Sequence, residues 1–131
     1  MDNRNLKVIA FSIFTMPITR KIIHWLPRIL GVGFVVFLSL FALDVFGEYS
    51  GWETILAFFI HLLPSFVLLG VVIIAWKHDL VGAVVFLAFA VFYIWMAGLD
   101  RPWSWYAGIS GPAALVGILF LMSWFQKRNN V

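Results

Sequence analysis

The chain of 131 residues has no cysteine and few charged residues. The absence of cysteine excludes a disulfide, an iron–sulfur cluster, a thiolate-bound metal and a thiol nucleophile. Charged side chains make up 11% of the residues, less than half of the share that is usual in soluble domains. Hydrophobic side chains make up 63%. This composition predicts an integral membrane protein that forms a single domain.

The sequence also lacks the short motifs of common catalytic chemistry. It contains no P-loop, no dinucleotide-binding fingerprint, no serine-hydrolase elbow and no HExxH zinc motif. A haem with two histidine ligands needs histidines at matching depths, whereas His24 and His78 lie at the edge of the apolar region and His61 lies inside it. Zinc needs three or four converging ligands, and Asp44, Glu53 and His61 lie at different depths. We therefore expect no cofactor and no metal, and no enzymatic activity is indicated.

Four apolar stretches are long enough to cross a bilayer as helices. We expect these spans at residues 29–46, 54–76, 80–97 and 103–125. At 1.5 Å per residue such helices are about 27–35 Å long, which matches a hydrocarbon core of about 30 Å. The sequence therefore predicts an all-α membrane protein with a four-transmembrane-helix bundle.

Residues 1–28 mix apolar and cationic side chains before the first span. Their helical spacing is typical of an interfacial amphipathic helix, which we expect to be broken near Pro17; a partly ordered tail is the alternative. Pro17 and Arg20 follow the first apolar run where a signal peptide would have its cleavage site, so a signal peptide is excluded. The predicted divisions are an interfacial segment at 1–28, a transmembrane domain at 29–125 and a cytoplasmic tail at 126–131.

Cationic residues are distributed unequally on the two sides of the predicted spans. Only Arg101 falls on one side. The other side holds Arg4, Lys7, Arg20, Lys21, Arg28, Lys77, Lys127 and Arg128. By the positive-inside rule, both termini lie in the cytoplasm. Because topology explains the net charge of +3, we expect no nucleic-acid partner.

The two halves of the apolar region resemble each other. Residues 33–41 (GFVVFLSLF) align with residues 82–90 (GAVVFLAFA), and Pro64 and Pro112 each precede a tryptophan by 12 residues. These matches predict a tandem repeat of two helical hairpins. Because each repeat holds an even number of helices, the copies would be related by an axis along the membrane normal.

The second span carries the polar residue that is most unusual for a bilayer. His61 lies about 12 Å inside the span, where an ionisable group is costly and faces the interior of a bundle. Ser65 follows one turn later, and Pro64 cannot bond the carbonyl of Ile60, so we expect a helix break there. The bundle should be organised around residues 57–70. The alternative for His61 is a neutral imidazole that bonds a neighbouring helix and serves packing only.

Other spans carry polar residues that should approach His61. Asp44 lies about one turn inside the outer end of the first span, where it would reach water if it is not part of a site. Ser110 precedes Pro112, where a second helix break is expected. Asp44 aligns with Tyr93 in the repeat, so the halves differ and we expect one asymmetric site. The predicted outward-facing polar pocket consists of Asp44, His61, Ser65, Tyr93 and Ser110.

Several short motifs follow one another in a recognisable order. They are LPRILG at 26–31, ALDVF at 42–46, HLLPS at 61–65, Trp76, and Gly-Pro at 111–112. This order resembles small four-helix bacterial membrane proteins that are grouped as a domain of unknown function, over residues 26–125. The resemblance implies a bacterial or archaeal inner-membrane protein, and it implies no activity.

Three functions fit these residues. The leading hypothesis is a non-enzymatic membrane protein that packs against a membrane-protein partner or a second copy of itself. The alternative is a ligand- or proton-handling module, transporter-like or sensory, that uses the pocket around His61 and Asp44. A lipid-modifying enzyme with His61 as general base lacks an evident nucleophile. A water-reachable cavity shared by Asp44, His61 and Tyr93 would favour the ligand-handling alternative, whereas a sealed or lipid-facing His61 would favour packing.

Overall fold

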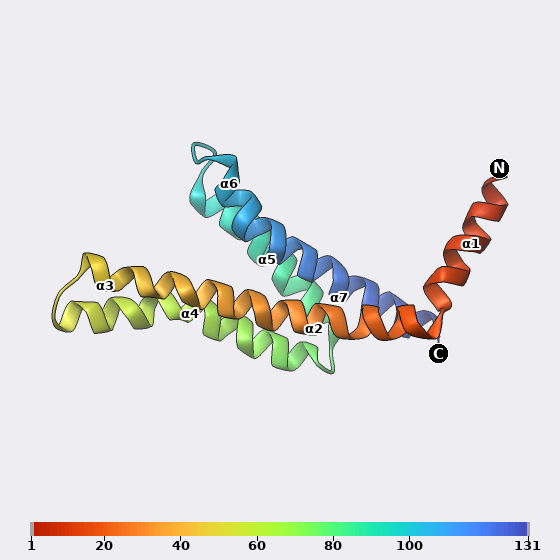
Figure 1. Cartoon of the computed structure of the whole chain (residues 1–131), viewed down its shortest axis with the longest axis horizontal. Helices are drawn as coiled ribbons and strands as arrows, with labels where there is room; N and C mark the ends of the chain where they lie inside the picture. The colour runs from red at the N-terminus through yellow and green to blue at the C-terminus, as the bar shows by residue number, and fades with distance from the viewer. Residues whose placement is uncertain (1, 131) are drawn as a thin grey trace.

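The structure, a computed structural model, describes residues 2–130. This part of the chain is helical with short connections and contains no strand (Figure 1). Four helical runs are long and apolar enough to cross a membrane: Pro17–Glu48, Trp52–Ala75, Asp79–Ala97 and Trp103–Asn129. The predicted all-α fold with four long apolar helices is therefore confirmed.

The four runs form two hairpins. The first hairpin consists of α2 (Pro17–Leu40), η1 (Phe41–Asp44), α3 (Val45–Glu48) and α4 (Trp52–Ala75). The second consists of α5 (Asp79–Ala97), α6 (Trp103–Trp105), η2 (Tyr106–Ser110) and α7 (Gly111–Asn129). Gly51 (φ 67°) and Gly98 (φ 73°) lie in the connections, where the backbone enters the left-handed region that glycine adopts without strain.

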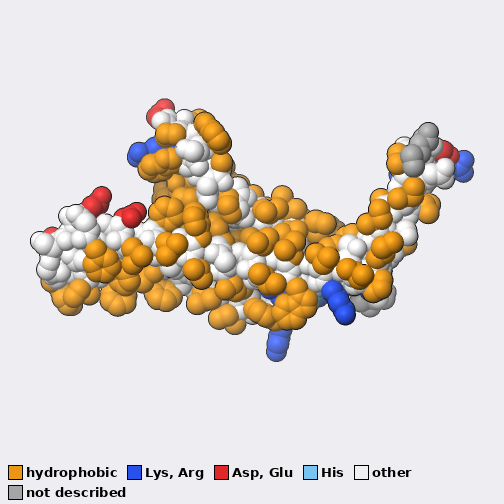
Figure 2. Space-filling view, in the orientation of Figure 1, with side chains coloured by type: hydrophobic (Ala, Val, Ile, Leu, Met, Phe, Trp, Pro, Cys, Tyr) orange, Lys and Arg blue, Asp and Glu red, His pale blue; other side chains and the backbone are white. Residues whose placement is uncertain are grey.

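The two hairpins meet at one end and diverge at the other (Figure 1). We call the end with the turn at residues 76–78 the junction end, and the end with the connections at residues 49–51 and 98–102 the loop end. Acidic side chains lie at the loop end of both hairpins (Figure 2). The molecule is therefore a wedge rather than a compact bundle.

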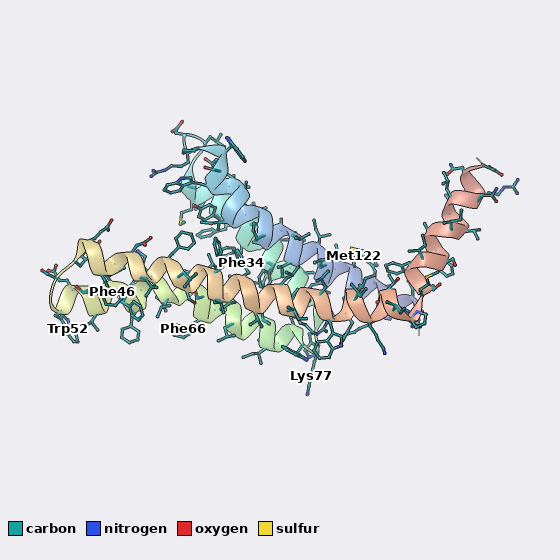
Figure 3. All side chains as sticks on the ribbon, viewed as in Figure 1. Phe34, Phe46, Trp52, Phe66, Lys77 and Met122 are labelled. Atoms are coloured by element: carbon teal, nitrogen blue, oxygen red, sulfur yellow. The ribbon has the colours of Figure 1, made fainter. Side chains whose placement is uncertain are left out.

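The core occupies the part of the wedge where the hairpins touch. Phe34 points from α2 toward the second hairpin (Figure 3), where it meets the ring of Phe86 at 6.2 Å. Phe86 and Phe120 are fully buried and their rings lie 6.0 Å apart. A Cβ atom at Gly117 of α7 would lie 2.7 Å from Cγ of Leu87, so glycine permits the close approach of α5 and α7.

The prediction that residues 57–70 organise the bundle is wrong. Among the four apolar runs, α4 has the smallest buried share, 17% of its most apolar stretch, against 33% for Pro17–Glu48. Within residues 57–70, only Ser65 and Leu68 are buried. Because the hairpins diverge, much of α4 packs against its own hairpin partner alone (Figure 1).

The N-terminal helix α1 (Asn3–Thr15) projects away from the hairpins (Figure 1) and meets them near its C-terminal end, where the Phe14 carbonyl accepts from the Gln126 side chain at 3.3 Å. Met16 is extended (ψ 137°) and α2 begins at Pro17, so the chain changes direction at the expected proline. No residue of α1 is buried, and its position on a membrane surface stays a prediction. The predicted domain boundary after residue 28 falls inside α2, which runs from Pro17 to Leu40 as one helix.

Each half of the predicted repeat corresponds to one hairpin. Residues 33–41 belong to α2 and the start of η1, and residues 82–90 belong to α5. Pro64 and Pro112 lie in the returning helices α4 and α7. The tandem repeat itself stays a prediction.

Candidate functional site

A cavity of about 770 Å³ lies between the diverging hairpins at the loop end. We call it the wide cavity. Its polar lining residues are Asp44, His61, Tyr93, Arg101 and Ser104. Aromatic side chains of both hairpins, including Phe41 and Trp105, make up much of the remaining wall. The structure thus brings three of the five predicted site residues to one cavity.

A second cavity of about 220 Å³ lies next to the first, and we call it the narrow cavity. His61 and Tyr93 line both cavities, while Ser65 and Pro64 line the narrow one. Ser110 lines neither: it is buried, and its hydroxyl donates to the carbonyl of Ala90 at 3.0 Å. Four of the five predicted residues therefore share this region, and Ser110 instead joins η2 to α5.

His61 has one ring nitrogen free for a partner from outside its helix. Its Nδ1 lies 2.8 Å from the carbonyl oxygen of Ala57, one turn earlier in α4. A carbonyl only accepts, so Nδ1 carries the hydrogen and Nε2 is left as an acceptor. This bond runs within one helix, whereas the packing alternative requires a bond between helices. The imidazole is exposed where the two cavities meet.

Ser65 is buried without a hydrogen bond. Its side chain lines the narrow cavity and the residue is 3% exposed. Within residues 2–130 its Oγ has no hydrogen-bond partner. A buried hydroxyl without a partner costs about 1–3 kcal/mol. In native proteins the large majority of such groups are paired with another protein atom or an ordered water molecule, so this one calls for an explanation.

Two irregular turns shape the wall of the wide cavity. In the first hairpin, the run Pro17–Glu48 tightens to a 3₁₀ turn over Phe41–Asp44. In the second hairpin, the run Trp103–Asn129 widens to a π turn over Tyr106–Ser110. π turns occur frequently at functional sites. Pro112 directly follows the π turn at the start of α7, whereas α4 continues through Pro64 as one helix.

The connection that carries Arg101 is held in place by Tyr106. The Tyr106 hydroxyl donates to the carbonyl of Gly98 and accepts from the backbone N–H of Arg101 at 3.3 Å. The Arg101 guanidinium carbon lies 5.2 Å from the ring centre of Trp105, a cation–π contact. Neither Arg101 nor Asp44 forms an ion pair within the described part of the chain. Both charges are therefore available to a ligand.

A second polar cluster, at the junction end, was not predicted. Asp79 Oδ1 lies 2.5 Å from Nη2 of Arg28, and its Oδ2 lies 2.7 Å from Nζ of Lys127 and 3.0 Å from Oγ of Ser123. The side chains of Arg28 and Asp79 are 0% and 1% exposed. We call these four residues the ionic junction. It ties α2 of the first hairpin to α5 and α7 of the second.

Sequence reasoning missed the ionic junction because topology accounts for its cations. Arg28 and Lys127 both fit the positive-inside rule, so neither suggested a buried partner. Asp79 was the available signal. It is the only acidic residue of the four apolar runs that lies at the cationic end, since the others lie toward the loop end. Those others are Asp44, Glu48 and Glu53.

The arrangement at the loop end offers several polar groups that could bind a ligand. His61 offers an acceptor, Ser65 a hydroxyl, and Asp44 and Arg101 opposite charges, all beside apolar walls. Over residues 2–130, no three His, Asp or Glu side chains form a group that could hold a metal ion. Covalent chemistry usually places a nucleophile beside a base, and the His61 imidazole bonds only a backbone carbonyl.

Comparison with known proteins identifies a family but no activity. A family model described as Domain of unknown function (DUF7670) matches residues 15–131. The match starts where α1 ends and covers both hairpins. No curated protein and no solved structure matches the chain. The function must therefore be argued from the site.

Proposed function

Since the chain belongs to the DUF7670 family, a domain of unknown function, we propose its function from the wedge between its hairpins. The protein is a non-enzymatic, four-span membrane protein that binds a small amphipathic ligand at the loop end. The wide cavity holds the body of this ligand, and His61 and Ser65 bond its polar group. The polar residues of the spans that line the two cavities thus have one common purpose, which is ligand binding.

The observation that carries this proposal is that the unpartnered Ser65 hydroxyl and the His61 imidazole line the same narrow cavity. In a membrane, both groups lie on a helix surrounded by hydrocarbon, where an unmet polar group costs more than it does in water. Both line a cavity rather than a packed interface. A polar ligand or the water that accompanies it would satisfy both groups.

The lining of the wide cavity supports the chemical class of the ligand. Ligand pockets are mostly apolar with a few convergent polar groups, and have volumes of about 300–1,000 Å³. The aromatic rings of Phe37, Phe41 and Trp105 favour a flat or aromatic body. Asp44 and Arg101 favour a charged or zwitterionic head. A small aromatic amphiphile meets both requirements.

We expect the purified full chain in lipid nanodiscs to bind tryptamine or indole-3-acetate, which share an indole body and carry opposite charges. His61→Ala should weaken binding about 5- to 10-fold, because the variant loses one hydrogen bond of about 1 kcal/mol. Asp44→Asn should selectively weaken the binding of the cation tryptamine, and Arg101→Gln should selectively weaken the binding of the anion indole-3-acetate. Equilibrium dialysis with radiolabelled probes measures each dissociation constant.

The control variant is Ser39→Ala. Ser39 lies on α2 outside both cavities, and its hydroxyl donates to Val35 of its own helix at 2.8 Å. The Ser39→Ala variant should bind both probes as tightly as the wild type does. Binding of neither probe above the level of protein-free discs, or equal binding by wild type and His61→Ala, would contradict the proposal.

Association with a partner membrane protein or a second copy is the other candidate function. It is supported by a groove of about 590 Å³ between α4 and α5, whose lining is apolar and includes Leu63, Val67, Val85 and Ala88. The small buried share of α4 points to the same surface. Light scattering in mild detergent separates the candidates, because a monomer at every concentration would leave self-association without support.

The proposal includes an orientation. The cations at the junction end favour the cytoplasmic side for both termini, and the wedge would then open to the outside. The inner membrane of a bacterium is the location that the sequence resemblance implies. Tyr93 and Asp44 match each other in the predicted repeat and line the wide cavity from different hairpins, which supports a repeat axis that passes between the hairpins.

A further inference from the structure

A separate pocket, at the junction end, is lined by cationic side chains. Its volume is about 490 Å³. We call it the basic pocket; its lining residues are Arg20, Lys21, His24, Trp25, Gln126, Lys127 and Asn130. The first four lie on α2 and the last three on or just after α7, so the pocket forms only where the two hairpins meet.

The charge of this region is strongly unbalanced. Among residues 2–130, no carboxylate lines the pocket. The nearby Asp79 is buried and already forms ion pairs with Arg28 and Lys127. The Nζ of Lys127 reaches Asp79, while 45% of the Lys127 side chain stays exposed. Arg20 and Lys21 have no ion-pair partner in the part of the chain that the structure describes. Among the described residues, four cations (Arg20, Lys21, Arg28 and Lys127) face one carboxylate, which leaves three positive charges uncompensated.

The pocket lies at the level that lipid head groups would occupy. The apolar run that starts at Pro17 has 32 residues, about 48 Å of helix, so it extends beyond a hydrocarbon core of about 30 Å. Trp25 lines the pocket and meets Trp76 edge to face at 6.1 Å. Paired indoles of this kind mark the membrane–water interface. Lys77, next to Trp76, extends away from the hairpins (Figure 3).

We propose that the basic pocket binds the phosphate group of an anionic lipid head group. Arginine and lysine are the usual phosphate ligands, the first through its planar fork and the second as a point charge. Basic pockets between membrane helices bind phosphate-bearing head groups. Arg20, Lys21 and Lys127 surround the phosphate, and Asp79 orients Lys127 from behind. The site is separate from the wide cavity at the loop end.

Native mass spectrometry of the full chain tests this site, after equilibration in detergent with equal amounts of phosphatidylglycerol and phosphatidylcholine. The wild type should retain phosphatidylglycerol selectively, because phosphatidylcholine carries a compensating cation on its phosphate. The double variant Arg20→Gln/Lys21→Gln should bind phosphatidylglycerol about 10- to 30-fold more weakly. Inorganic phosphate at millimolar concentration should not displace the lipid.

The matched control is Arg4→Gln/Lys7→Gln, which removes the same charge from α1 and should leave lipid retention unchanged. Asn130→Asp adds a negative charge at the exposed rim of the basic pocket without removing a cation, and it should also weaken lipid retention. Far-UV circular dichroism verifies that each variant is folded. Equal losses in both double variants, equal retention of the two lipids, or full retention by Asn130→Asp would overturn the proposal. Displacement by inorganic phosphate would overturn the lipid assignment in favour of a soluble phosphate.

Discussion

Replacing Asp79 with asparagine is expected to lower the free energy of unfolding by about 3–5 kcal/mol. The substitution leaves the shape of the ionic junction nearly unchanged but removes its only negative charge. Arg28 is fully buried and would then lie without a counter-charge, which is the costly case for a buried ion pair. The loss of the ion pair with Lys127 costs less free energy, because the half-exposed Lys127 side chain can turn toward solvent.

Unfolding in mixed micelles, followed by far-UV circular dichroism during titration with dodecyl sulfate, measures this change. Asp100→Asn makes the same chemical change on an exposed residue of a connection and should alter stability by no more than about 0.5 kcal/mol. The double variant Arg28→Met/Asp79→Leu should recover most of the loss, because well-packed apolar side chains often replace a buried ion pair without cost. A loss for Asp79→Asn no larger than that for Asp100→Asn would contradict the account.

Gly82→Ala is expected to destabilise the fold by about 1–3 kcal/mol, the usual cost of overpacking. A Cβ atom at this position of α5 would lie 2.8 Å from the Cβ of Ala75 and 2.8 Å from the Phe120 ring. Both neighbours are fully buried, so neither can move freely. The Phe120 ring also lies under the Arg28 guanidinium, 5.9 Å from its carbon. The added methyl group would therefore strain the contact between the two hairpins and disturb the ionic junction.

Gly33→Ala on α2 is the matched control for this prediction. No atom lies within 4 Å of the Cβ that the substitution adds. Alanine is favoured over glycine inside a helix by about 0.5–1 kcal/mol, so this variant should be as stable as the wild type or slightly more stable. The same dodecyl sulfate titration compares the two variants. Equal effects of the two substitutions would show that the hairpins are not closely packed at Gly82.

The helices could be predicted from the sequence because their signal is local. The second, third and fourth apolar runs lie close to their predicted ranges. The first run begins earlier than expected, at Pro17, since α2 continues outward through residues that are cationic but still helical. Hydropathy detects the apolar part of a helix and misses its polar extension.

The wedge and the ionic junction could not be predicted because they depend on contacts between distant residues. Arg28 and Asp79 are 51 positions apart, and nothing local indicates that their side chains meet. For the same reason, hydropathy suggested a central place for α4, although the divergence of the hairpins leaves this helix at the side. The angle between two packed hairpins is set by side-chain packing rather than by the apolar character of either hairpin.

Depth along the spans predicted part of the candidate site. Asp44, His61 and Tyr93 were grouped by depth alone, and they line one cavity. Ser110 lies at a similar depth, but its hydroxyl bonds Ala90 of α5. Depth gives the height of a residue and not the direction in which its side chain points. The structure adds Arg101, from the connection before α6, to the cavity wall.

The central claim is that the space beside Ser65 is a solvent-reachable binding cavity rather than a lipid-filled gap. Because the natural chain has no cysteine, single-cysteine variants report this directly through modification by a small charged methanethiosulfonate in lipid nanodiscs. Phe66, the next residue of α4, is 56% exposed and points away from the second hairpin (Figure 3). The account predicts rapid modification of the Ser65→Cys thiol and none of the Phe66→Cys thiol. An unreactive Ser65→Cys variant, with rapid modification of an exposed Glu53→Cys control at the loop end, would contradict it.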